Sequence, residues 1–133
     1  MKTLLYLCVF SINVHVIFTC TCVGVPTNGC DSEYSILGFV LRERGIGTAP
    51  NDEIIYTVRV LHVYKAPGFL PRTVQIRAYV EGSLCGLRLR QRRVYVISGY
   101  TDESRLRTNA CAYTRAWDEI PASELGNLFC RRS

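Results

Sequence analysis

Six cysteines follow a short apolar leader, and they constrain the fold more than any other feature of this chain. The sequence has seven cysteines, of which Cys8 lies inside the leader. The other six are Cys20, Cys22, Cys30, Cys85, Cys111 and Cys130. An even number of cysteines in a small exported domain is typical of a disulfide framework, and six cysteines allow fifteen pairings. No Cys-x-x-Cys pair occurs, so we expect three disulfides and no structural zinc site.

Residues 1–19 have the pattern of a secretory signal peptide. Lys2 supplies a positive charge, and residues 4–18 form an apolar stretch that is shorter than the roughly 20 residues needed to span a membrane. Thr19 is small enough to precede a signal-peptidase cut. We therefore expect an extracellular protein without a membrane span, made of one domain over residues 20–133. Its mature chain begins at Cys20.

The composition is basic and rich in arginine. The 16 Lys and Arg residues include Lys2, so the mature chain carries 15 of them against 11 Asp and Glu. Arginines alternate along a stretch that we expect to be a strand, and others lie where a neighbouring strand could follow. Such a row could hold sulfated glycosaminoglycans, and a solvated basic surface is the alternative. The candidate residues are Arg88, Arg90, Arg92, Arg93, Arg105 and Arg107.

The hydrophobic pattern predicts a mainly β protein. Short apolar or alternating stretches, separated by Gly, Pro, Asn and Asp, predict strands with a loop at 45–52. Pro121 suits the first turn of a short helix over 122–129. Together these elements predict a five-stranded OB-type barrel with short flanking helices. The expected strands are residues 36–41, 54–65, 74–78, 94–100 and 105–111.

The apolar phase changes within the stretch 54–65. Even-numbered positions are apolar at its start, whereas Leu61 and Val63 are apolar near its end. We expect a β-bulge near Val60 that keeps both sets turned inward, since bulges are common where barrels bend.

An ordered set of motifs resembles the inhibitory N-terminal, netrin-like domain of the tissue inhibitors of metalloproteinases. The resemblance covers nearly the whole mature chain. It rests on Cys20-Thr21-Cys22, Ile54-Ile55-Tyr56, Ser83-Leu84-Cys85-Gly86-Leu87, Tyr95-Val96-Ile97-Ser98-Gly99, Cys111, Trp117-Asp118 and Cys130. It implies the disulfides Cys20–Cys85, Cys22–Cys111 and Cys30–Cys130.

The resemblance also implies a mechanism. The Cys20 α-amino and carbonyl groups would bind the catalytic zinc of a metalloendopeptidase similar to the matrix metalloproteinases, and Thr21 would enter the adjoining substrate pocket. Cys22 and Val23 would follow on one side of the zinc. Ser83 and Leu84, held by Cys85, would lie on the other side. The protein would have no cofactor of its own and would act as a monomer.

Other readings follow from the same residues. An enzyme is not expected, because the mature chain has a single histidine, His62, and no paired carboxylates in a catalytic motif. A netrin-like binding module without inhibition is the main alternative, because such a module needs no free Cys20. Export argues against nucleic acid as a partner. Because the sequence stops three residues after Cys130, we expect no second disulfide-bonded domain.

Overall fold

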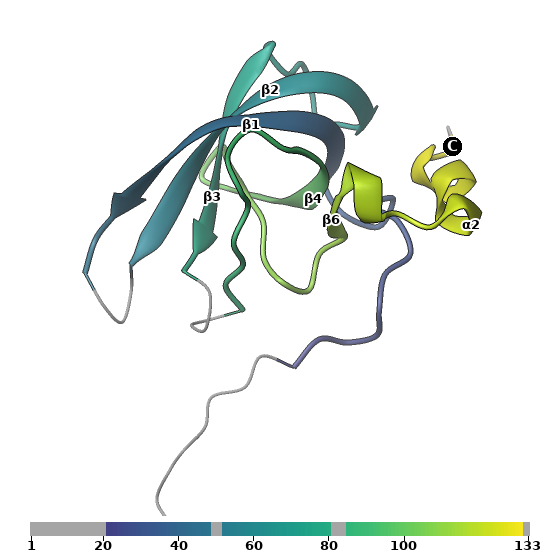
Figure 1. Cartoon of the computed structure of the whole chain (residues 1–133), viewed down its shortest axis with the longest axis horizontal. Coiled ribbons are helices and arrows are strands. Elements are labelled where there is room, and N and C mark those ends of the chain that lie inside the picture. Colours follow the sequence, from purple (N-terminus) through teal and green to yellow (C-terminus); the bar gives the residue numbers. More distant parts are fainter. Residues whose placement is uncertain (1–20, 49–51, 81–84, 132–133) are drawn as a thin grey trace, which may run out of the picture.

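The computed structural model describes residues 21–48, 52–80 and 85–131. The chain forms a β-barrel with short helices on one side (Figure 1). The strands are β1 (Tyr34–Ile46), β2 (Glu53–Lys65), β3 (Thr73–Tyr79), β4 (Val94–Asp102), β5 (Arg105–Arg107) and β6 (Thr114–Ala116). The helical elements are η1 (Trp117–Glu119), α2 (Ala122–Leu125) and η2 (Gly126–Leu128).

The strand order closes the sheet on itself. The order is β1-β2-β3-β5-β4-β6, and β1 also pairs with β4, so five strands form a ring. All pairings are antiparallel except that of β3 with β5. This confirms the predicted five-stranded OB-type barrel. The structure adds β6, which the sequence pattern did not predict and which extends the sheet beyond β4.

Alternation of side chains places the core inside this ring. On β3, Val74, Ile76 and Ala78 are buried, whereas Gln75 is exposed. These side chains meet Ile36 of β1, Tyr56 of β2 and Ile97 of β4 in the main core. A second, smaller cluster lies between the barrel and the C-terminal helices. It consists of Val96, Tyr113, Ile120 and Leu128.

Two sequence-based boundaries need correction. The first strand continues through Gly45, which we expected in a loop, because residues 42–46 pair with β2 in a long hairpin. The fifth strand ends at Arg107 and not at residue 111. Its end follows from Asn109, whose Oδ1 accepts hydrogen bonds from the backbone N–H groups of Cys111 and Ala112 at 2.9 and 3.1 Å. This turn directs the chain away from the sheet.

The bulge in β2 is present, but its consequence differs from our expectation. Leu37 and Gly38 of β1 lie opposite His62 and Val60, so Leu61 is the extra residue. Leu61 and Val63 do not turn inward, since they are 50% and 42% exposed. Tyr64 is the residue from this half of β2 that packs against the second cluster. A second register shift, between the pairs Ile36–Val63 and Ser35–Lys65, leaves Tyr64 as another extra residue of β2.

Candidate functional site

The N-terminal segment, residues 21–33, runs along the barrel without forming a strand (Figure 1). Thr21, Cys22 and Val23 are all exposed, and Val23 is fully so. The segment is tied to the barrel by the disulfide Cys22–Cys111, with 5.3 Å between the Cα atoms. A covalent bond thus holds this exposed backbone where hydrogen bonding within a sheet does not.

A second anchor holds the other end of the N-terminal segment. Cys30 forms a disulfide with Cys130, and Lys65 Nζ donates a hydrogen bond to the Cys30 carbonyl at 2.7 Å. Gly29 is buried so closely against the barrel that a Cβ atom would lie 2.0 Å from Ser98 Oγ. Only glycine fits there without a shift of the neighbouring residues. Both disulfides agree with the pairing that the resemblance implied.

The segment at Cys85 lies next to the first anchor. The backbone N–H of Ala110 donates to the Cys85 carbonyl at 2.8 Å, and Ala110 directly precedes Cys111. Cys85 is itself disulfide-bonded and has a φ of 58°, which is unusual for a residue with a side chain. Gly86 is required here, because a Cβ atom would approach the Val80 carbonyl oxygen to 1.9 Å.

The predicted site residues are therefore brought together in part. Thr21, Cys22 and Val23 lie on one exposed segment whose anchor, Cys111, is adjacent in the fold to Cys85. Cys20, Ser83 and Leu84 lie outside the described residues, as does the predicted signal peptide. The disulfide Cys20–Cys85 and the zinc-binding role of Cys20 stay predictions.

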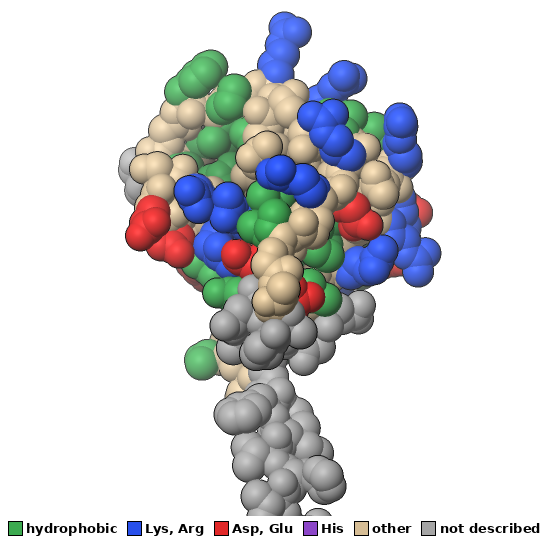
Figure 2. All heavy atoms as spheres, turned by 90° about the vertical axis from the view of Figure 1, so that its left-hand side faces the viewer, with side chains coloured by type: hydrophobic (Ala, Val, Ile, Leu, Met, Phe, Trp, Pro, Cys, Tyr) green, Lys and Arg blue, Asp and Glu red, His purple; other side chains and the backbone are tan. Residues whose placement is uncertain are grey.

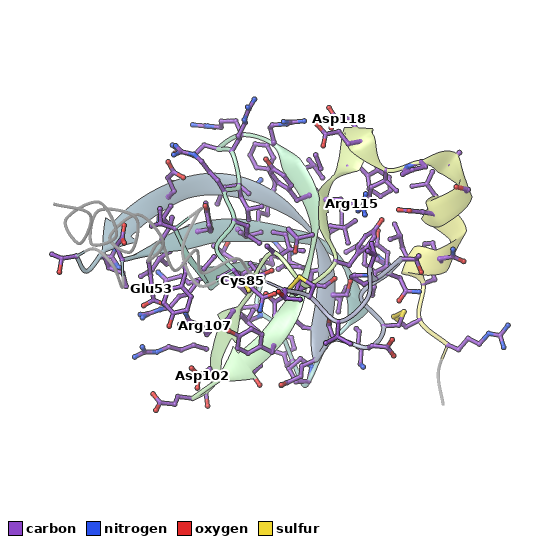
Figure 3. The ribbon with its side chains drawn as sticks, turned by 90° about the horizontal axis from the view of Figure 1, so that it is seen from below. Glu53, Cys85, Asp102, Arg107, Arg115 and Asp118 are labelled. Atoms are coloured by element: carbon purple, nitrogen blue, oxygen red, sulfur yellow. A yellow bond between two sulfur atoms is a disulfide. The ribbon has the colours of Figure 1, made fainter. Side chains whose placement is uncertain are left out.

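A buried ion pair supports the same end of the barrel. The Arg107 guanidinium contacts the Glu53 carboxylate (Figure 3). It also lies over the Tyr79 ring, 4.9 Å from its centroid. Burial lowers the pKa of Arg107, but hydrogen bonding and charge interactions with Glu53 and Tyr100 together outweigh burial and raise it, so the guanidinium stays charged. The pair joins the start of β2 to β5, and Tyr79 adds the end of β3.

The predicted arginine row does not exist as one surface. Arg107 is buried, and Arg88 and Arg93 contact Glu43 and Asp118 at 3.3 and 2.9 Å. No strand forms at residues 85–93. Instead, the backbone N–H groups of Leu89 and Arg90 donate to tyrosine hydroxyls at 3.0 and 2.8 Å.

Lys and Arg side chains are spread across the face of the barrel in Figure 2 and do not form a single line. Of the six predicted residues, Arg88, Arg90, Arg92 and Arg105 are exposed, and Arg88 contacts Glu43. Glycosaminoglycan binding stays a prediction, with Arg90, Arg92 and Arg105 as the exposed candidates that form no ion pair among the described residues.

The sequence did not reveal the residues whose contacts within the barrel support the site. Arg107 looked like a surface cation, and Glu53, Gly29 and Lys65 carried no motif. A charged residue in a short β-stretch gives no signal of burial unless its partner is known. Among the described residues, no group of three or more His, Cys, Asp or Glu side chains could hold a metal ion. Within the same ranges, no helix is long and apolar enough to cross a membrane.

The fold and the site define a class: a disulfide-bonded OB-type barrel with an exposed, covalently anchored leading segment. Within that class, the family described as "Tissue inhibitor of metalloproteinase" matches residues 18–130. The chain belongs to this family.

Several curated relatives are named "Metalloproteinase inhibitor 3". The protein from Gallus gallus is 28% identical over 126 residues, which cover 92% of this chain and 59% of the relative. The protein from Xenopus laevis is 26% identical over 112 residues, which cover 82% of this chain and 52% of the relative. A protein from Margaritifera margaritifera named "NTR domain-containing protein" is 38% identical over 42 residues, which cover 32% of this chain and 28% of the relative. This chain thus spans between half and three-fifths of the two inhibitors' length.

Proposed function

We propose that this protein is a secreted inhibitor of zinc metalloendopeptidases and that it acts through the N-terminal segment. Membership of the family and the names of the relatives support inhibition as the activity. The observation that carries the proposal is the exposed backbone at Thr21–Val23, anchored by Cys22–Cys111 beside Cys85. An exposed, covalently fixed edge is suited to enter the cleft of a protease.

The chemistry requires that the mature chain begin at Cys20. A catalytic zinc in such proteases has three protein ligands and an open fourth position. The α-amino nitrogen and carbonyl oxygen of Cys20 would occupy that position together. An α-amino group has an unperturbed pKa of about 8, so a substantial fraction carries a free lone pair near neutral pH. The zinc belongs to the bound protease and not to this chain.

The neighbouring residues would align the rest of the cleft. Thr21 would point into the pocket next to the zinc, and Cys22 and Val23 would continue along the same side. Ser83 and Leu84 would contact the opposite side. Ordering a free peptide costs on the order of 1–2 kcal/mol per residue, and disulfides formed during folding remove much of that cost from binding.

The decisive experiment blocks the terminus without touching the fold. We expect that one Ala added before Cys20 abolishes inhibition of a matrix metalloproteinase, because the backbone nitrogen becomes an amide and no longer binds zinc. One Ala added after Ser133 is the matched control and should leave inhibition intact. The melting temperature should be unchanged in both. Full potency in the N-terminally extended protein would refute the mechanism.

A second experiment tests the pocket contact. Thr21→Gly removes a side chain that would fill the pocket beside the zinc, so we expect inhibition constants to rise by different factors across a panel of metalloendopeptidases. Thr27→Gly, an exposed position in the same N-terminal segment, is the control. Equal constants for Thr21→Gly and the parent protein against every protease would remove Thr21 from the site.

The alternative function is a netrin-like binding module without inhibition. The short match to the NTR domain-containing protein is the observation that favours it. Mass spectrometry of the secreted protein separates the two functions, because any residue retained before Cys20 prevents chelation. A mature terminus at Cys20, together with measurable inhibition, would exclude the module reading.

A further inference from the structure

A groove opens along the barrel where β3 and β5 separate. The two strands pair only at Ile76–Leu106 and Arg77–Arg107, although β3 begins at Thr73. Residues 73–75 thus have no strand neighbour on that side in the described structure. We call this depression the seam groove. It has a volume of about 700 Å³ and is lined by residues 67–71, 73–75, 77, 101 and 104–106.

One wall of the seam groove is apolar. It is the loop between β2 and β3, with the sequence Pro67-Gly68-Phe69-Leu70-Pro71. Leu70 packs against the main core, which fixes the loop, whereas Phe69 is 94% exposed. An aromatic side chain standing free beside a groove, on a loop fixed by prolines and a core contact, is typical of a binding surface.

The other wall is the tight turn between β4 and β5. Asp102 pairs with Arg105, so Glu103 and Ser104 form a two-residue loop, and both have positive φ, at 50° and 66°. This geometry matches the right-handed twist of the hairpin and gives a well-defined turn. Both walls are therefore set by local structure before any ligand arrives.

The charge of the seam groove is positive. Arg77 and Arg105 line it, and none of the lining residues is acidic, although the turn that forms one wall carries Glu103 and the lining residue Thr101 contacts Glu33. Within the described ranges neither arginine forms an ion pair, unlike Arg88, Arg93 and Arg107. The groove thus combines an open strand edge, apolar side chains and two cations without acidic partners.

We propose that the seam groove binds an extended acidic peptide segment of a partner protein, which adds to β3 as a strand. Backbone groups of residues 73–75 would pair with the peptide, as in other cases of strand addition. Side chains of a strand alternate, so acidic residues would face Arg77 and Arg105 while apolar ones contact Phe69 and Leu106. The apolar wall and the strand edge favour a peptide over a sulfated sugar.

We call the exposed residues Thr21–Val23, anchored beside Cys85, the proposed inhibitory edge. The seam groove lies at the opposite end of the barrel. The β2–β3 loop and the β4–β5 turn form the end of the barrel at which β1 begins, since Ser35 pairs with Lys65 and Tyr34 with Gly99. Cys85 and Cys111 lie beyond the far ends of β3 and β5. A partner in the groove would leave the edge free, so the inference does not rest on the proposed inhibition.

The test uses a defined probe and isotope-labelled full-length protein. The probe is a blocked heptapeptide of alternating Glu and Val, the control peptide replaces Glu with Lys, and a heparin hexasaccharide represents sulfated sugars. We expect the Glu peptide to shift the amide resonances of Thr73, Gln75 and Leu106. The Lys peptide should not shift them.

Variants assign the contacts. Arg105→Glu should weaken binding of the Glu peptide at least tenfold, and Phe69→Ala should weaken it several-fold without loss of fold, because this side chain is exposed. Arg90→Glu, an exposed arginine outside the groove, is the matched control and should bind as the parent does. No shift at residues 73–75, equal binding of the Lys peptide, or shifts there with the hexasaccharide but not the Glu peptide would each overturn the proposal.

Discussion

The barrel and the N-terminal segment of this protein are held by different forces. The barrel, from β1 to β5, buries its side chains in one core and closes its hydrogen bonding in a ring. The N-terminal segment forms no strand, exposes Thr21–Val23, and is fixed by Cys22–Cys111 and Cys30–Cys130. The difference teaches that stability and the geometry of the proposed inhibitory edge are separable, because non-covalent burial secures one and crosslinks secure the other.

Removing the first crosslink should have the largest effect. With Cys22→Ser and Cys111→Ser together, we expect inhibition to fall about a hundredfold or more, because several backbone residues must then be ordered on binding. The bond spans 89 residues, so stability should fall by up to about 4 kcal/mol. Inhibition constants and urea denaturation measure the two effects.

The second crosslink provides the matched control. Cys30–Cys130 spans 100 residues, so its removal should destabilise the fold by a similar amount. Inhibition should fall much less, because this bond anchors the far end of the N-terminal segment. Equal losses of inhibition in the two double variants would show that Cys22–Cys111 has no special part in positioning the edge.

A cavity in the barrel should lower the stability of the fold without weakening inhibition. Ile97→Ala empties a fully buried position on β4, and we expect about 3 kcal/mol of destabilisation. Inhibition by the folded fraction should not change, since the crosslinked edge is intact. Leu61→Ala, at a half-exposed position, should change stability by less than about 0.5 kcal/mol. A weaker inhibition constant for folded Ile97→Ala would show that the two regions are coupled.

Alkaline pH should produce the smallest effect, at the boundary between barrel and helices. Burial raises the pKa of Tyr113 to about 12, helped by the hydrogen bond that its hydroxyl donates to Glu124 at 2.8 Å. Unfolded tyrosine titrates near pH 10, so the stability from this neutral hydroxyl is complete below pH 10 and is lost as pH rises through about 12.

Tyr113→Phe isolates this contribution. The variant should lose less stability between pH 9 and 12 than the parent, by roughly 1–2 kcal/mol. Burial also raises the pKa of Tyr34, Tyr56 and Tyr64, so a remaining alkaline loss is expected. Urea denaturation across this range measures the difference. Parallel stability curves for the two proteins would show that Tyr113 does not contribute.

Local patterns of the sequence were enough for most of the fold. The alternation at Val74, Ile76 and Ala78 correctly predicted an inward face, and the motifs of the family correctly implied Cys22–Cys111 and Cys30–Cys130. Errors arose where distant partners decide the outcome. Leu61 and Val63 turn outward because the second cluster takes Tyr64 instead.

What the sequence determined by itself was the β-class, the family, and the two disulfides Cys22–Cys111 and Cys30–Cys130. The tertiary structure alone decided which charges are buried and where the barrel stays open. Arg107 contacts Glu53, which lies 54 positions away in the sequence. The seam groove forms because β3 and β5 pair over only two residue pairs. The alternation of apolar residues along one strand shows which side chains face the core and which face solvent. The pairing of strands that are distant in sequence depends on the whole chain.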